Sequence, residues 1–122
     1  MLAKKVAAFA DDTKALDIVI LDMRKLVNFC DYFVICTGTS DRHVRSIAEA
    51  VKDSLEVLGI KSYVGKNKSL GASPASSIND PDVEGCWMLI DLGDVVAHVF
   101  EPAARDFYGL EHLWQDAPKV KR

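Results

Sequence analysis

Two apolar runs that meet at Gly93-Asp94 limit most strongly what this chain can fold into. The runs cover 86–92 and 95–101, and both consist mainly of apolar residues. A Gly-Asp pair between two such runs predicts an antiparallel β-hairpin. Side chains alternate between the two faces of a strand, and here one face carries only apolar residues, which predicts a core face. That face consists of Met88, Ile90, Val95, Ala97 and Val99.

The opposite face of the hairpin mixes aromatic with ionisable side chains. It consists of Trp87, Leu89, Asp91, His98 and Phe100. Aromatic residues are enriched at the centres of protein–protein interfaces, so this mixture indicates a partner-binding surface. The alternative is a second packed face under a helix, with His98 hydrogen-bonded to a carboxylate. A further hypothesis makes Asp91, Asp94 and His98 metal ligands, but a tight turn rarely gives three such ligands a suitable geometry.

Periodicity places further strands and helices around the hairpin. The expected helices cover 2–13, 41–58 and 102–108, and 110–114 close the fold. The expected strands cover 17–23, 32–38 and 60–64, the first of them buried on both faces. Together with the hairpin, these elements predict a single domain over 1–122, of the α/β class, with a mixed five-stranded sheet and helices packed on it. Between them, 65–85 lack any periodicity and predict a long loop.

The junction between the second expected strand and the helix after it has the sequence TGTSDRHV (37–44). Free N–H groups at such a junction can hold a phosphate. The segment has neither of the glycine-rich phosphate-binding forms, which favours a tight turn with Ser40 or Asp41 as the helix cap. His43, between Arg42 and Arg45, then belongs to a solvated helix face.

Acidic residues are concentrated in the C-terminal part of the chain. Residues 80–116 contain nine Asp or Glu and one basic residue, Arg105, whereas 1–79 contain eleven Lys or Arg and nine acids. Such a surface repels phosphate backbones and attracts basic proteins. We therefore expect a basic protein partner and no direct sequence-specific binding of nucleic acid.

Several other classes of protein are disfavoured. The cysteines, Cys30, Cys36 and Cys86, form no C-x-x-C pair, and we expect them to be buried as small apolar residues rather than to bind zinc or form disulfides. No apolar run approaches the roughly 18–20 residues that cross a bilayer. The first fourteen residues have neither a signal-peptide core nor a transit-peptide composition, so we expect a cytoplasmic protein without a membrane partner.

Three motifs in order resemble the ribosomal silencing factor family, also known as Iojap-like. They are TGTSDRHVRSIAEAV (37–51), W-x-L-I-D-L-G-D-V-V-x-H-V-F (87–100) and R-x-F-Y-x-L-E-x-L-W (105–114). The resemblance covers roughly 15–115. The 65–86 segment departs from it, because the connection in family members is usually shorter.

The resemblance implies a fold similar to the nucleotidyltransferase fold without its chemistry, hence no catalytic residue, metal or cofactor. It also implies a translational repressor that binds the large ribosomal subunit through ribosomal protein L fourteen. There it blocks joining of the small subunit when nutrients are scarce. The implied contact positions are Trp87, Leu89, Asp91, Asp94, His98 and Tyr108, and the mixed hairpin face adds Phe100. Alternative functions are a nucleotidyltransferase-like enzyme or nucleotide-binding protein, and a scaffold acting off the ribosome. The sequence does not decide between a monomer and a homodimer.

Overall fold

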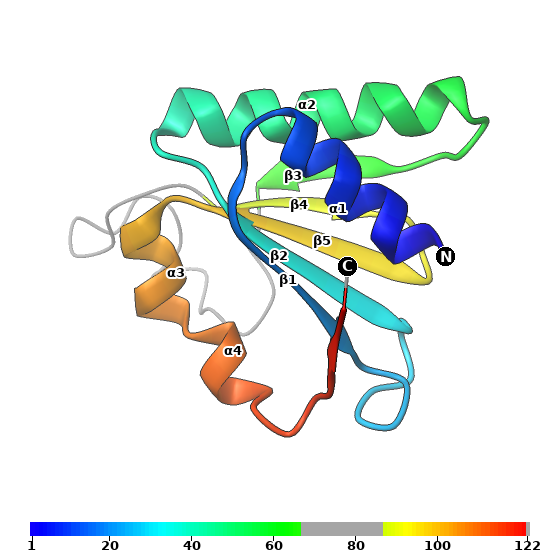
Figure 1. Ribbon diagram of the computed structural model, residues 1–122, viewed down its shortest axis with the longest axis vertical. Coiled ribbons are helices and arrows are strands. Elements are labelled where there is room, and N and C mark those ends of the chain that lie inside the picture. Colours follow the sequence, from blue (N-terminus) through cyan, green and yellow to red (C-terminus); the bar gives the residue numbers. More distant parts are fainter. Residues whose placement is uncertain (67–86, 122) are drawn as a thin grey trace.

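A six-stranded mixed sheet, in the order β3-β4-β5-β2-β1-β6, runs through the computed structural model (Figure 1), which describes residues 1–66 and 87–121. The strands are β1 Leu16–Asp22, β2 Tyr32–Thr37, β3 Tyr63–Lys66, β4 Trp87–Asp91, β5 Val95–Phe100 and β6 Lys119–Val120. Neighbouring strands are antiparallel except for the central β2 and β5, which are parallel. The predicted hairpin is confirmed as β4 and β5.

The sheet has one strand more than the five predicted. The additional strand, β6, pairs only with Ile20 and Leu21 of β1. Two residues are too few to show a period, so the sequence pattern could not reveal this strand. Strand β3 begins three residues later and ends two residues later than predicted, because the chain turns through Gly59, at φ +76°, before it becomes extended.

Helices cover both faces of the sheet. They are α1 Leu2–Asp12, α2 Asp41–Val57, α3 Pro102–Tyr108 and α4 Leu110–Leu113. In Figure 1, α1 and α2 lie on one side of the sheet, and α3 and α4 on the other. None of the helices within 1–66 and 87–121 has the length and apolar character required to span a bilayer.

The predicted core face of the hairpin is confirmed, since all five of its residues are buried under α1 and α2. They pack against an apolar stripe of α2 that includes Ile47, Val51 and Leu55. Each fully buried aliphatic side chain of this size stabilises the fold by about 1.5–3 kcal/mol relative to an exposed one. This first core therefore fixes α1 and α2 on the sheet.

The junction before α2 is a turn with a helix cap, as predicted. Ser40 Oγ accepts a hydrogen bond from the His43 backbone N–H at 3.1 Å. A Cβ atom on Gly38 would lie 2.9 Å from the backbone nitrogen of Val44, so only glycine fits this close approach. The His43 ring does more than face solvent: its Nδ1 accepts from the Thr39 N–H at 2.9 Å, and its Nε2 lies 2.9 Å from the Thr13 carbonyl oxygen.

The prediction that the strand over 17–23 is buried on both faces is wrong for Asp17, its first residue, and the observed β1 begins one residue earlier, at Leu16. Leu16 and Asp17 are exposed, and the pairing register with β2 shifts between Leu16 and Val19. Asp17 has a φ of +49°, which is uncommon for a residue with a side chain. This irregularity interrupts the alternation of faces, so the start of β1 leaves the core.

The predicted loop lies, from residue 67 on, outside the described residues, as does Cys86. Cys30 and Cys36 are buried, as predicted. Burial raises the pKa of the Cys36 thiol to about 12, which keeps it protonated and unreactive at neutral pH.

Candidate protein-binding surface

The mixed face of the hairpin is largely a second packed layer, and our interpretation of it as an open interface was wrong for three residues. Trp87 is 3% exposed, and His98 and Phe100 are fully buried. They pack with Leu21, Phe33 and Ala104 on the side of the sheet that α3 and α4 cover. A short helix over 102–108 was predicted after β5, but strand alternation alone does not show which face of the sheet it covers.

Aromatic rings fill the space beneath α3. The Tyr108 ring lies 4.4 Å from the Trp87 ring, and Phe100 lies 4.7 Å from it on the other strand of the hairpin. His98 contacts the edge of Phe33, with ring centroids 4.6 Å apart. Tyr108, the last contact position implied by the resemblance, is therefore half-buried and belongs to the packing of α3.

His98 bonds an indole, not the carboxylate considered above. Trp87 Nε1–H donates to His98 Nδ1 at 3.2 Å. Complete burial lowers the pKa of His98 to about 3, so the ring is neutral. With Nδ1 acting as acceptor, the proton of the neutral ring resides on Nε2. Within the described parts of the chain, this Nε2 has no hydrogen-bond partner.

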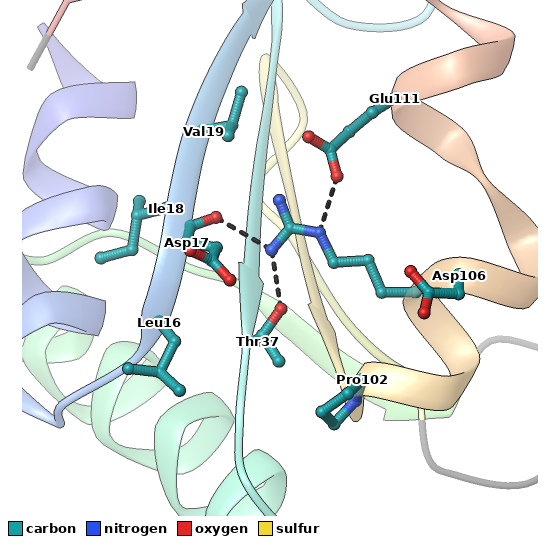
Figure 2. A pocket seen from close by; sticks show the side chains of 9 residues that line it. Leu16, Asp17, Ile18, Val19, Thr37, Pro102, Asp106 and Glu111 are labelled. Atoms are coloured by element: carbon teal, nitrogen blue, oxygen red, sulfur yellow. Dashed lines mark hydrogen bonds and ion pairs between the residues drawn. The ribbon is translucent and has the colours of Figure 1, made fainter.

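Arg105 connects α3 to the sheet and to α4. Its Nε donates to Glu111 at 2.6 Å, and its Nη1 donates to the Thr37 hydroxyl at 2.7 Å and to the Asp17 carbonyl at 2.9 Å. Arg105 lines a pocket of about 630 Å³, and Figure 2 shows its three partners, Asp17, Thr37 and Glu111, facing one another there. The pocket is lined by Leu16, Asp17, Ile18, Val19, Thr37, Pro102, Arg105, Asp106 and Glu111.

The remaining predicted positions lie at the hairpin turn and are accessible. Asp91 and Asp94 are exposed, and Leu89 is half-buried. One oxygen of Asp91 accepts the Gly93 N–H at 2.8 Å, which fixes the turn. The Asp94 carbonyl oxygen accepts the backbone N–H of Asp31 at 2.7 Å, so a third carboxylate adjoins the turn.

The pKa of the Cys30 thiol reflects this grouping of carboxylates. Burial is the largest cause that raises the pKa of this thiol, and the charges of Asp31 and Asp91 raise the pKa further, to about 11. The two carboxylates are thus close enough to act on the same thiol. Several like charges at one end of the sheet create a negative potential that favours a basic partner.

Exposed aromatic residues beside the turn were not among the predicted positions. Tyr63 of β3 lies opposite Asp91 in the sheet and is 78% exposed, and Phe29 is 54% exposed, with its ring 6.2 Å from that of Phe33. Neither residue belongs to a recognisable motif, so only the pairing of strands brings them beside the turn. We define the turn surface by its six members: Phe29, Asp31, Tyr63, Leu89, Asp91 and Asp94.

The metal-site hypothesis gains no support from this geometry. His98 is buried beneath α3 and bonded to Trp87, while Asp91 and Asp94 face solvent at the turn. Across 1–66 and 87–121, no group of three or more His, Cys, Asp or Glu is arranged to hold a metal ion.

Comparisons with known proteins agree on one family. The family model "Ribosomal silencing factor during starvation" matches residues 1–122. A Bacillus subtilis protein, "Ribosomal silencing factor RsfS", is 42% identical over 117 residues, covering 96% of this chain and 87% of the relative. The maize "Protein Iojap, chloroplastic" is 32% identical, covering 98% of this chain and 46% of the relative.

Solved structures share the fold of this chain. A crystal structure from Bacillus halodurans has a TM-score of 0.71 at 35% identity, covering 99% of this chain and 97% of that one. Another, from Chromobacterium violaceum, has a TM-score of 0.71 at 34% identity, covering 93% and 84%. The family description names a regulatory role rather than a catalytic one. By its sequence and its fold, this chain belongs to the ribosomal silencing factor family.

Proposed function

We propose that this protein represses translation by binding the large ribosomal subunit and preventing the small subunit from joining. The observation that carries the proposal is the turn surface, where three carboxylates lie beside two exposed aromatic rings. Ribosomal proteins that contact RNA are rich in basic residues, and a negative surface attracts such proteins. The aromatic rings supply contact area that excludes water from the charge pairs.

Ribosomal protein L fourteen is the specific partner that we propose, from the family resemblance. The contact residues would be those of the turn surface, of which Leu89, Asp91 and Asp94 follow the family motif. The partner in this proposal is a protein, and the negative turn surface supports that choice because it repels ribosomal RNA. The protein would act in the cytoplasm, with 1–122 as one functional unit.

The proposed mechanism is steric and requires no enzymatic turnover. A standard interface covers on the order of 800 Å² on each partner, which is enough to occupy one region where the subunits meet. A bound protein and the small subunit cannot share that region. Inhibition should therefore be stoichiometric, and should depend on whether the subunits are separate when the protein is added.

Order of addition tests the mechanism. The purified protein should inhibit translation when mixed with separated subunits, and much less when mixed with assembled ribosomes. Inhibition that persists after washing, at concentrations far below that of the ribosomes, would refute the steric mechanism and favour the nucleotidyltransferase-like alternative.

A pair of charge variants tests the surface. Replacing Asp91 and Asp94 together by Asn should weaken co-sedimentation with large subunits at least tenfold, because both negative charges leave the turn. The matched control replaces Glu49 and Asp53 by Gln and Asn, since these are exposed acids on α2, on the other side of the sheet. Equal binding by the two double variants would exclude the turn surface as the contact site.

A further inference from the structure

The helices α3 and α4, together the cover, pack on the mixed face but make fewer contacts with the sheet than α1 and α2 do. The two helices have 7 and 4 residues, too short to be stable without tertiary packing. Tyr108 anchors the cover on Trp87, and Arg105 anchors it on the sheet across the pocket (Figure 2). Elements with few buried apolar contacts open more readily than the rest of a fold.

Arg105 is the polar fastening of this cover. Its guanidinium reaches Thr37 at the end of β2 and the carbonyl of Asp17 in β1, while its Nε pairs with Glu111 of α4. The Arg105 side chain is 13% exposed, and its bonds to Thr37 and Glu111 are partly shielded from water, whereas the bond to the Asp17 carbonyl lies at the surface. Beside them, the pocket separates the cover from residues 16–19 of β1, so apolar packing is thin along this border.

Beneath the cover, His98 carries a buried hydrogen-bond donor that nothing within the described residues accepts. Trp87 occupies Nδ1, and no residue within 1–66 or 87–121 accepts the Nε2–H hydrogen bond. Buried donors are almost always paired, and an unpaired one is unfavourable. The closed form therefore retains a donor that an acceptor from another molecule would satisfy.

We propose that the cover opens when the protein binds its partner, so that Trp87 and His98 contact an apolar segment of a basic protein whose backbone carbonyl oxygen accepts the His98 Nε2–H hydrogen bond. This inference rests on the proposed function, because it completes the same surface. Leu89 and Asp91 follow Trp87 on the same face of β4, so the uncovered pair would be continuous with the turn surface. The negative charge of the turn surface favours a basic partner, and Trp87 and His98, once uncovered, supply the apolar centre of the contact.

Opening can be measured through Trp87 itself. In a Trp114→Phe background, Trp87 is the single fluorescent indole, and acrylamide quenching reports its access to solvent. Replacing Arg105 by Met removes the polar fastening, so the quenching constant should rise several-fold. Apparent affinity scales with the fraction of competent protein, so affinity for large subunits should rise about tenfold. The matched control is Arg45→Met, which cuts an arginine–carboxylate pair on α2 and should change neither quantity.

The His98 donor has its own test. His98→Phe removes the Nε2–H group while keeping an aromatic ring, so affinity for large subunits should fall about tenfold without a matching change in quenching. Unchanged affinity in His98→Phe would overturn the role of the donor. Should Arg105→Met fail to fold, Thr37→Val removes one acceptor at nearly constant shape and should raise quenching and affinity in the same direction.

Other outcomes separate this inference from the proposed function. Increased quenching in Arg105→Met without increased affinity would mean that the closed form binds, which overturns the opening step and leaves the proposed function intact. Unchanged quenching would mean that Arg105 does not hold the cover, which also overturns the inference. Failure of the wild-type chain to co-sediment with large subunits would overturn the proposed function, and the inference with it.

Discussion

Truncation of Trp87 should destabilise the whole domain. The side chain is 3% exposed, packs between Phe100 and Tyr108, and donates a hydrogen bond to His98. Large aromatic-to-alanine changes in cores cost about 3–5 kcal/mol, and loss of the bond to His98 adds about 1 kcal/mol. A domain of this length has a total stability of about 6–18 kcal/mol at typical values per residue, so Trp87→Ala removes a large share of it.

Urea unfolding followed by circular dichroism measures this effect. With a denaturant slope of about 1–3 kcal/mol/M, the midpoint should fall by about 2 M. Trp114→Ala is the matched control, because this second tryptophan is only half-buried and should cost clearly less. A change below about 1 kcal/mol for Trp87→Ala, in a protein that keeps its fold, would refute the assignment of Trp87 to the core.

Three further predictions follow from the same structure. Folding lowers the pKa of His98 from 6.5 to about 3, so between these pH values the unfolded state binds a proton that the folded state does not. The free energy of unfolding should therefore fall as pH decreases from about 6.5 towards 3. The variant His98→Gln should flatten this dependence in urea titrations at several pH values. Gly38→Ala should lower the free energy of unfolding by about 1–3 kcal/mol, because the added Cβ would meet Val44. In the same urea titrations Gly65→Ala should lower it less, because a Cβ there meets nothing within 4 Å. Raising salt from about 50 to 300 mM should slow association with large subunits more than it speeds dissociation, and stopped-flow rates independent of salt would contradict electrostatic attraction at the turn surface.

The sequence pattern predicted the elements well because their signals are local. The apolar face of the hairpin and the stripe of α2 repeat every two or nearly four residues, so both the elements and their buried sides follow from a short window. A cap at Ser40 or Asp41 was predicted for the same reason, and the residue that caps is Ser40, whose partner His43 lies three residues away. Confirmed predictions thus concern contacts between residues that are near in sequence.

The mixed face of the hairpin was harder to predict, because the burial of its side chains depends on contacts with residues that are distant in sequence. Alternation showed that Trp87, His98 and Phe100 share a face, but it carried no information on whether α3 lies above them. Arg105 reaches Thr37 and Asp17, which are 68 and 88 residues away in sequence, and no pattern links residues at such separations. Burial of these side chains could therefore be established only from the packed structure.

The parallel pairing of β2 with β5 has a consequence for the folding kinetics. Each strand already has an antiparallel neighbour close in sequence, β1 for β2 and β4 for β5, so two hairpins can form early from local contacts. Joining them pairs Tyr32 with Val95 and closes a chain of about 60 residues. Contacts across such separations slow folding, so this central seam sets the rate at which the sheet assembles. Because the β4–β5 hairpin is already formed when this seam closes, substitutions in β2, in β5 and at the Gly93 turn should all change how fast the chain folds.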